Sequence, residues 1–284
     1  MHQRLANFYQ EHKSAFEKNF QVVLAEFEVE AIHKMRTSTK RLRALLQLIE
    51  YLADGKFRAK KQLKKIRQLF KYAGKIREIQ IEMVTLLDYS GKLKIKFPEY
   101  NEYLKYREKK EIARFLRALP EIDKKGIIID DDYILKNIKN IPAKKLNKNV
   151  PGFIELKKQT LLDLNKLQVT NPRIHENRTH IKQLYYLYDH LTELSGQKEI
   201  LKMKKEKMRE IEQMIGTWHD LVNSGPLLKA FFQTKDFKKN NKYKILKKQL
   251  FADRKKKLKE ITGVLTSVGL KAKAQKPKGK SQGR

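Results

Sequence analysis

The chain has 284 residues, of which 65 are Lys or Arg and 32 are Asp or Glu, so its formal net charge is +33 at neutral pH. This excess excludes an ordinary neutral surface and indicates a polyanionic partner: nucleic acid, polyphosphate or an anionic membrane surface. The sequence has no cysteine, which excludes disulfide scaffolds, thiolate metal sites and cysteine nucleophiles. Hydrophobic residues make up 40% of the chain, which is enough for a packed core.

The beginning of the chain, MHQRLANFYQEHKSAF, contains no uninterrupted apolar run of the signal-peptide type. No stretch of about 18 apolar residues occurs anywhere in the sequence. We therefore expect a soluble, cytoplasmic protein without membrane insertion.

Apolar residues recur at steps of three and four, as in Leu42, Leu45 and Ile49, and strand-like alternation is nearly absent. Glycine and proline are sparse, and they divide the chain into segments of helical length. This pattern predicts an all-α fold of roughly ten helices. The first helix is expected over residues 3–28.

An internal repeat with an offset of 142 residues relates the two halves of the chain. His33 and Gly74 fall on His175 and Gly216 without a gap, and each pair is separated by the same 41 residues. Histidine and glycine are rare here, so this register is informative. Ile32, Arg36, Thr37, Lys40, Leu42, Leu45 and Leu52 likewise fall on Ile174, Arg178, Thr179, Lys182, Leu184, Leu187 and Leu194.

The repeat predicts a duplicated helical bundle, because each copy is longer than a solenoid repeat. We expect the first bundle over residues 1–125 and the second over 150–268, the latter opening with a helix at 151–168. A connector over 126–149 would hold at most a short helix. Residues 269–284 have no apolar periodicity and no acids, which predicts a disordered basic tail.

The second helix of each copy carries a row of polar residues beside its apolar stripe. The row in the first copy follows i, i+3, i+7 and i+10 spacing, which keeps its members within about 80° on one face. For one copy alone, a solvated face or a buried structural histidine would be an adequate interpretation. Identical spacing in both copies favours anion binding. The rows are His33, Arg36, Lys40 and Arg43, and His175, Arg178 and Lys182, with Tyr185 in the last place.

The predicted third helix of the first copy is rich in Lys and Arg, with no acid between residues 55 and 77. An exposed helix would ordinarily gain from glutamates spaced four residues from its lysines. The missing acids therefore favour a surface that meets an anion over a bias of composition. One stripe is Lys60, Lys64, Arg67, Lys71 and Lys75, and its counterpart is Lys198, Lys202, Lys205 and Arg209.

These motifs resemble the CHAD domain, the conserved histidine α-helical domain. HKMRTSTKRLR at 33–43 is similar to the opening motif of that family, and HENRTHIKQLY at 175–185 is similar to its second copy. AGKIREIQ at 73–80 and MIGTWHDL at 214–221 resemble its Gly-x-x-Arg-Asp-x-Asp and Gly-x-x-Asn-Asp elements. The chain departs from the family pattern at Glu78, Gln80, Tyr185 and His219.

The resemblance implies two helical bundles related by pseudo-twofold symmetry, with a basic groove or pore between them. It also implies non-catalytic binding of long-chain inorganic polyphosphate and targeting to polyphosphate granules. Lys and Arg donate strong charge-assisted hydrogen bonds to phosphate oxygens, and neutralising a dense polyanion releases counterions. The expected phosphate contacts are Arg36, Lys40, Arg43, Arg178 and Lys182, with His33 and His175 as donors or orienting groups; the stripes add Lys60, Lys64, Arg67, Lys202 and Arg209.

A nucleic-acid binder is the alternative, because the same basic field attracts DNA or RNA. The stripes, however, lack the interleaved aromatics of a base-stacking platform. We expect no catalytic residues, no metal and no cofactor. In HENRTH the histidines at 175 and 180 are i,i+5 and cannot act as the i,i+4 pair of a zinc site. Asp130, Asp131 and Asp132 are expected to cap a helix, and Trp218 to lie in the core.

Overall fold

The computed structural model describes residues 2–122, 130–166, 171–234 and 240–268. Within these ranges the chain forms eleven α-helices and no β-strand, so the all-α prediction is confirmed for them. The predicted tail and the first residues of the predicted connector lie outside them. The helices are α1 (His2–Glu26), α2 (Val29–Leu52), α3 (Ala59–Gln62), α4 (Lys64–Leu93), α5 (Pro98–Ile122), α6 (Asp131–Lys139), α7 (Ala143–Lys166), α8 (Asn171–Tyr186), α9 (Tyr188–Ser195), α10 (Lys205–Thr234) and α11 (Asn241–Ser267).

The helices form because each presents an apolar stripe to a neighbour. In α2, for example, Ile32, Met35, Leu42 and Ile49 are fully or almost fully buried, and their spacing of three, seven and seven residues follows one helix face. α2 packs along α1 and also contacts α4, α7 and α8. It is therefore the central helix of the main core.

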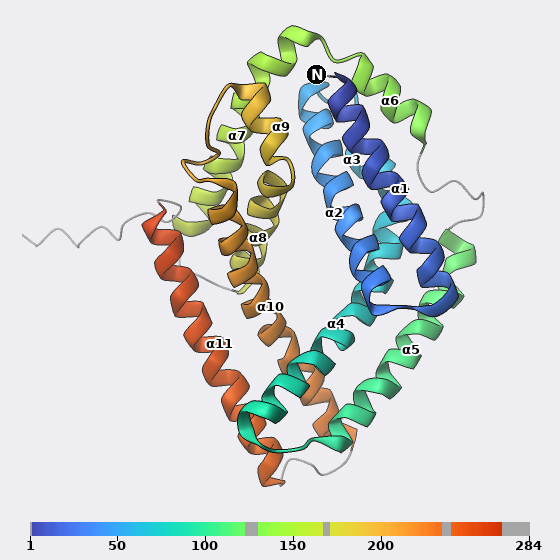
Figure 1. Ribbon diagram of the computed structural model, residues 1–284, viewed down its shortest axis with the longest axis vertical. Coiled ribbons are helices and arrows are strands. Elements are labelled where there is room, and N and C mark those ends of the chain that lie inside the picture. Colours follow the sequence, from blue (N-terminus) through green and yellow to red (C-terminus); the bar gives the residue numbers. More distant parts are fainter. Residues whose placement is uncertain (1, 123–129, 167–170, 235–239, 269–284) are drawn as a thin grey trace, which may run out of the picture.

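Figure 1 shows α1, α2, α4 and α5 on one side of the molecule and α7, α8, α9 and α11 on the other. The long helices α4 and α10 contact each other, and Figure 1 shows them crossing in the lower part of the molecule. Below the crossing, α4 and α5 pack with α10 and α11 around a second, smaller apolar cluster that includes Tyr100, Phe231 and Tyr243. The crossing thus joins the two halves of the chain.

The predicted third helix is interrupted. The chain forms the short α3, passes through Leu63 and restarts as α4 at Lys64. Leu63 and the preceding Phe57 are both buried in the main core. Leu63 thus ends α3 while remaining part of the main core.

The helix predicted to open at residue 151 begins eight residues earlier, at Ala143, so α7 runs through Pro151. Proline lacks the N–H that would bond to the carbonyl of Asn147. Asn147 is exposed, so water can replace that bond. Beside the proline, α7 approaches α2 closely: a Cβ added at Gly152 would lie 2.7 Å from the hydroxyl of Tyr51.

Glu82 is a buried acid at the crossing of α4 and α10. Its carboxylate accepts a short hydrogen bond from Ser224 on α10 and one of 2.9 Å from the hydroxyl of Tyr100 on α5. Burial raises the pKa of Glu82 to about 7, although these two hydrogen bonds lower it; Asp220 raises it further. The folded protein therefore retains a proton that the unfolded chain releases near pH 4.5.

We expect Glu82→Gln to stabilise the protein at pH 8 by about 1–3 kcal/mol and to have little effect near pH 4.5. Between those values the folded state binds more protons than the unfolded state at Glu82, so this group makes the free energy of unfolding fall as pH rises. Glutamine can accept from Tyr100 and donate to Ser224. Urea denaturation at both pH values measures the difference, and the exposed Glu102→Gln serves as control. An equal gain at both pH values would contradict the assignment.

Candidate anion-binding site

A basic pocket of about 440 Å³ opens between α2, α4, α8 and α10, and we call it the central pocket. Of the described residues, seven Lys or Arg side chains and one acid, Glu78, line it. The structure thus brings the two predicted polar rows together, except for His33 and Tyr185. The predicted residues that line the central pocket are Arg36, Lys40, Arg43, His175, Arg178 and Lys182.

In the first half of the chain, the cations of the row gather around Phe70. The guanidinium carbons of Arg36 and Arg43 lie 4.0 Å and 5.2 Å from the centre of the phenyl ring, and the ammonium of Lys40 lies 5.9 Å from it. Arg36 also donates a 2.7 Å hydrogen bond to the carbonyl of Phe70. Cation–π contacts hold these groups in place without neutralising them. Their charge therefore stays available to an anion.

The repeated glycines give the repeated arginines room. A Cβ added at Gly74 would lie 2.8 Å from Nη1 of Arg36, and one added at Gly216 would lie 3.1 Å from Nη2 of Arg178. The first distance is too short for a real contact and the second is tight. A larger residue at either position would therefore displace the arginine guanidinium, so glycine favours the observed placement of Arg36 and Arg178 against the helix backbone.

In the second half, Glu212 on α10 neutralises part of the row. Its Oε1 atom lies 3.2 Å from Nη2 of Arg178 and forms a shorter ion pair with Lys182. The side chains of all three residues are largely buried. Residue 212 corresponds to Phe70 at the offset of 142, so an acid stands in the second half where the first half has an aromatic residue. The sequence analysis predicted a role for neither residue.

Burial and crowded positive charge lower the pKa values of basic groups in the central pocket. Burial lowers the pKa of Lys40 well below its usual range, and repulsion from Lys182, Arg36 and Arg178 lowers it further. Burial, opposed in part by Glu78, lowers the pKa of Arg36 to about 10. Among the described residues, Lys40 has no hydrogen bond or ion pair. A bound anion would relieve this repulsion.

His175 lies beside a second histidine, His219, which the sequence analysis noted only as a departure from the family motif. The two rings are 4.8 Å apart, between α8 and α10. Burial, followed by the charges of His175 and Arg178, lowers the pKa of His219 to about 4, and burial also lowers that of His175. Both rings are therefore neutral at pH 7, and each can donate one N–H to an anion.

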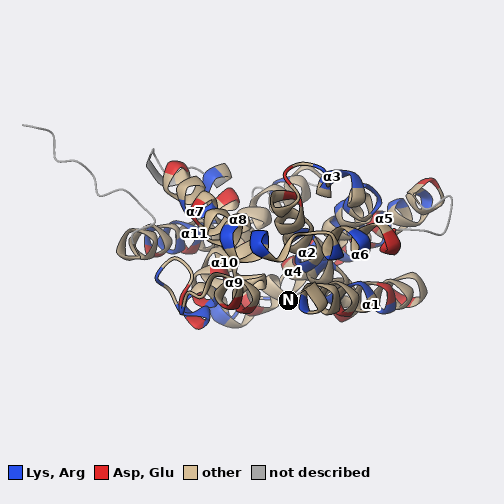
Figure 2. Ribbon diagram, turned by 90° about the horizontal axis from the view of Figure 1, so that it is seen from above, with Lys and Arg blue, Asp and Glu red and all other residues tan. Residues whose placement is uncertain are grey.

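A second basic pocket, of about 780 Å³, adjoins the first, and we call it the side pocket. Arg43, Phe70 and Lys71 line both. No acid from the described ranges lines the side pocket; besides Arg43 and Lys71, its cations are Arg58, Lys60, Lys61, Lys64 and Arg67. Figure 2 shows blue Lys and Arg segments on the ribbon beside the label of α3. The predicted stripe thus continues the central pocket, despite the break at Leu63.

Three predicted residues line neither pocket. His33 is exposed on α2, and Lys202 and Arg209 are exposed near the start of α10. The stripe predicted from Lys198 to Arg209 is wrong as a helical face, because α10 begins only at Lys205. Lys202 has a left-handed backbone with φ of 57°, which directs the chain out of helical geometry.

The remaining expectations concern single residues. Trp218 is buried with 1% of its surface exposed, and the carboxylate of Asp130 caps α6 by accepting from the backbone N–H of Tyr133, as predicted. The described part of the chain has no group of three His, Cys, Asp or Glu side chains placed to hold a metal. None of the helices within the described ranges combines the length and apolar character needed to cross a bilayer.

Comparison with known proteins places this geometry in a family. No curated protein matched the chain. Among solved structures, the crystal structure of the CHAD domain from the plant Ricinus communis is similar in fold, with a TM-score of 0.68 and 17% identity over 95% of this chain and 91% of that one. The CHAD domain family model matches residues 8–229. The chain therefore belongs to the CHAD domain family.

Proposed function

We propose that the protein binds long-chain inorganic polyphosphate in the central and side pockets, without catalysis. One observation carries this proposal: the two pockets share Arg43, Phe70 and Lys71, so their cations form one continuous surface, and Glu78 is the only acid that lines it within the described part of the chain. A chain of phosphates could pass from one pocket into the other and remain in contact with Lys or Arg along its path.

The central pocket would hold one part of the polyphosphate chain most firmly. Lys40 is already desolvated and repelled by its neighbours, so phosphate binding there removes an unfavourable interaction as well as adding a favourable one. In the side pocket, Lys60, Lys64 and Arg67 are exposed and would contribute weaker, salt-sensitive contacts. His33, Lys202 and Arg209, which line neither pocket, would add only long-range attraction.

The proposal includes an internal duplication, with a basic surface where the halves meet. The contact between Arg36 and Gly74 recurs between Arg178 and Gly216, in the register of the 142-residue repeat. Glu82 and Ser224, which share a hydrogen bond across the α4–α10 crossing, are themselves 142 residues apart. In a duplicated chain, equivalent positions meet in this way at a pseudo-twofold axis.

Long polyphosphate should bind tightly, whereas pyrophosphate should bind far more weakly, because only a long chain can occupy both pockets at once. We expect the logarithm of the affinity to fall steeply with the logarithm of the salt concentration, with a slope of about −5 if roughly six phosphates are neutralised. Fluorescence anisotropy with labelled polyphosphate of about a hundred units measures both quantities.

Single-stranded DNA and RNA serve as competitors in the same assay at near-physiological salt, with phosphate release measured after incubation with Mg²⁺ and Mn²⁺. Equal affinity for pyrophosphate and long polyphosphate would contradict the extended site. More effective competition by DNA or RNA than by unlabelled polyphosphate would make nucleic acid the ligand, and phosphate release would make the protein an enzyme. If polyphosphate is the ligand, association with polyphosphate granules in the cytoplasm follows from the same affinity.

A further inference from the structure

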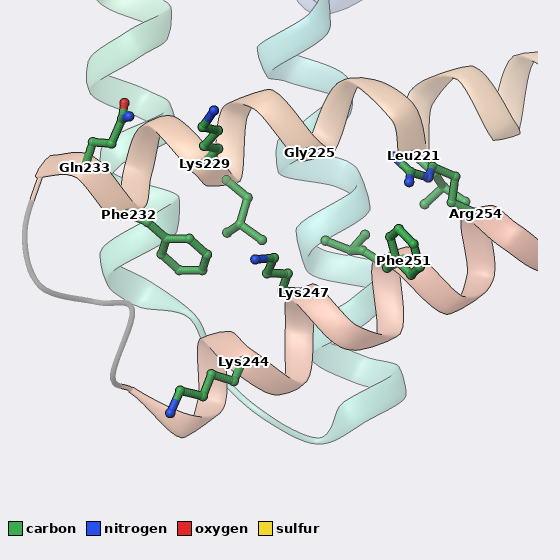
Figure 3. A pocket seen from close by; sticks show the side chains of 11 residues that line it. Leu221, Gly225, Lys229, Phe232, Gln233, Lys244, Lys247, Phe251 and Arg254 are labelled. Carbon is green, nitrogen blue, oxygen red and sulfur yellow. The ribbon is translucent and has the colours of Figure 1, made fainter. Parts of the chain in front are cut away.

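A different kind of pocket, of about 640 Å³, lies between α10 and α11, and we call it the apolar groove (Figure 3). Its apolar lining consists of Leu221, Leu228, Phe232, Leu250 and Phe251. Phe251 is 57% exposed, although the guanidinium carbon of Arg254 lies 4.8 Å from the centre of its ring. An exposed aromatic ring beside an apolar hollow is a common feature of surfaces that bind a partner.

The edges of the apolar groove are basic. Lys229 lines it on α10, and Lys244, Lys247 and Arg254 line it on α11; Figure 3 shows the Lys247 side chain extending into the space between the two helices. Among the residues that the structure describes, no Asp or Glu lines the groove. From Lys244 to Arg254 the α11 edge extends about 15 Å, or nearly three helical turns. Positive charge therefore follows the α11 side along its length, and Lys229 adds one cation on the α10 side.

This combination decides between possible occupants. A second copy of the chain would bring its own Lys and Arg against the same charges, and residues 269–284 contain Lys and Arg but no acid. Polyphosphate would gain nothing from the apolar floor. A fatty-acid anion has one charge at one end, whereas three cations here are distributed along α11 and a fourth lies on α10. Charge complementarity calls for an occupant with an apolar face and acids on both flanks.

We propose that the apolar groove binds an amphipathic helix of a partner protein, with apolar residues facing the floor and Asp or Glu along both flanks. Helices commonly dock in this way, through apolar anchors about one turn apart. Gly225 lines the groove between Leu221 and Leu228, and nothing lies within 4 Å of the place of its absent Cβ. The missing side chain leaves room for an anchor residue of the helix.

The test uses the full chain and three labelled synthetic helical peptides of about three turns. The first has leucines on one face and glutamates on both flanks, the second has lysines in place of the glutamates, and the third scrambles the sequence of the first. Anisotropy at near-physiological salt measures binding. We expect the first peptide to bind at one site and the other two to bind at least about tenfold more weakly.

Two variants locate the site. Phe251→Asp places a carboxylate on the apolar floor, and Lys244→Glu with Lys247→Glu reverses one edge. Each should weaken binding of the acidic peptide about tenfold or more. Matched controls are Tyr106→Asp, at an aromatic residue that is 62% exposed on α5, and Lys109→Glu with Lys148→Glu, which are exposed on α5 and α7. None of these control positions lines the groove. Circular dichroism confirms that all four variants are folded.

Several outcomes would overturn the proposal. They are failure of the acidic peptide to bind, equal binding of the scrambled peptide, and equal losses in the groove variants and their controls. A fourth arm titrates laurate against the acidic peptide. The decisive result would be that laurate binds at one site, more tightly than the peptide, and that Phe251→Asp abolishes this binding. In that case the groove is a site for anionic amphiphiles and the helix proposal is wrong.

Discussion

Lys40→Met should make the protein more stable and should weaken its binding of polyphosphate. The ammonium of Lys40 is desolvated and is repelled by Lys182, Arg36 and Arg178, so removing its charge should raise the free energy of unfolding by about 1–3 kcal/mol. Polyphosphate affinity should fall about tenfold or more, because one charge-assisted hydrogen bond is lost. Urea denaturation and anisotropy measure the two effects separately.

The opposite signs of these effects make the prediction specific. Replacement of a purely structural lysine would lower the stability of the protein, and replacement of a lysine remote from the ligand would leave the affinity unchanged. The exposed Lys109→Met is the matched control and should change neither quantity by much. Polyphosphate should also raise the melting temperature of the natural protein more than that of Lys40→Met, since stabilisation by a ligand follows its affinity. A variant that loses both stability and affinity would show that Lys40 holds the fold.

The pH dependence of stability follows the same reasoning. The pKa of Lys40 is lowered in the folded state, so the folded protein binds fewer protons there than the unfolded chain. The contribution of Lys40 to the free energy of unfolding therefore falls as pH decreases from the ordinary lysine pKa of 10.5 to the lowered pKa of the folded state. Lys40→Met should remove that contribution.

The polar row could be predicted from the sequence because helical spacing fixes which residues share a face. Arg36, Lys40 and Arg43 lie on α2 at spacings that any regular helix would align. The repeat indicated that Arg178 and Lys182 form an equivalent row, but their meeting with the first row in one pocket depends on how α2, α4, α8 and α10 pack. Such long-range packing does not follow from local periodicity.

The residues missed by the sequence analysis act across helices. Phe70 lies on α4 and contacts cations of α2, while Glu212 lies on α10 and pairs with cations of α8. Each has an ordinary place in an amphipathic pattern, so its own helix gives no signal. Comparison of the two halves at the 142-residue offset could have found both, because an aromatic residue and an acid occupy one repeat position.

The failure at Lys202 has a different cause. The stripe from Lys198 to Arg209 assumed that the second copy keeps the helix of the first. Leu201 and Lys202 instead have φ of 56° and 57°, and α10 begins after them. A left-handed backbone is uncommon in non-glycine residues and leaves no clear trace in a Lys-rich sequence. Spacing alone therefore overestimated the length of the helix.

Glu212 should act as an internal competitor of the ligand, and Glu212→Gln should raise polyphosphate affinity about tenfold. Its carboxylate forms ion pairs with Arg178 and Lys182, although Glu212 itself does not line the central pocket. A bound polyphosphate must therefore share both cations with this carboxylate. Glutamine keeps the size of the side chain and an oxygen acceptor but removes the negative charge, so the cations become available.

The reciprocal change tests the same idea in the first half of the chain. Phe70→Glu would place a carboxylate beside Arg36, Lys40 and Arg43 and should lower the affinity about tenfold. Stability should move in the other direction in each case: Glu212→Gln leaves a buried pair of cations less compensated, whereas Phe70→Glu neutralises charge that is now uncompensated. Long polyphosphate is titrated against both variants at fixed salt.

Glu102→Gln controls for net charge, because Glu102 forms only an exposed ion pair of 2.9 Å with Lys105 on α5. It should raise the affinity less than twofold, since the charge is screened there. If Glu102→Gln and Glu212→Gln raise the affinity equally, the ligand responds to total charge alone. If Glu212→Gln lowers the affinity while the protein remains folded, Glu212 positions Arg178 and Lys182 for the ligand, and the carboxylate is part of the site.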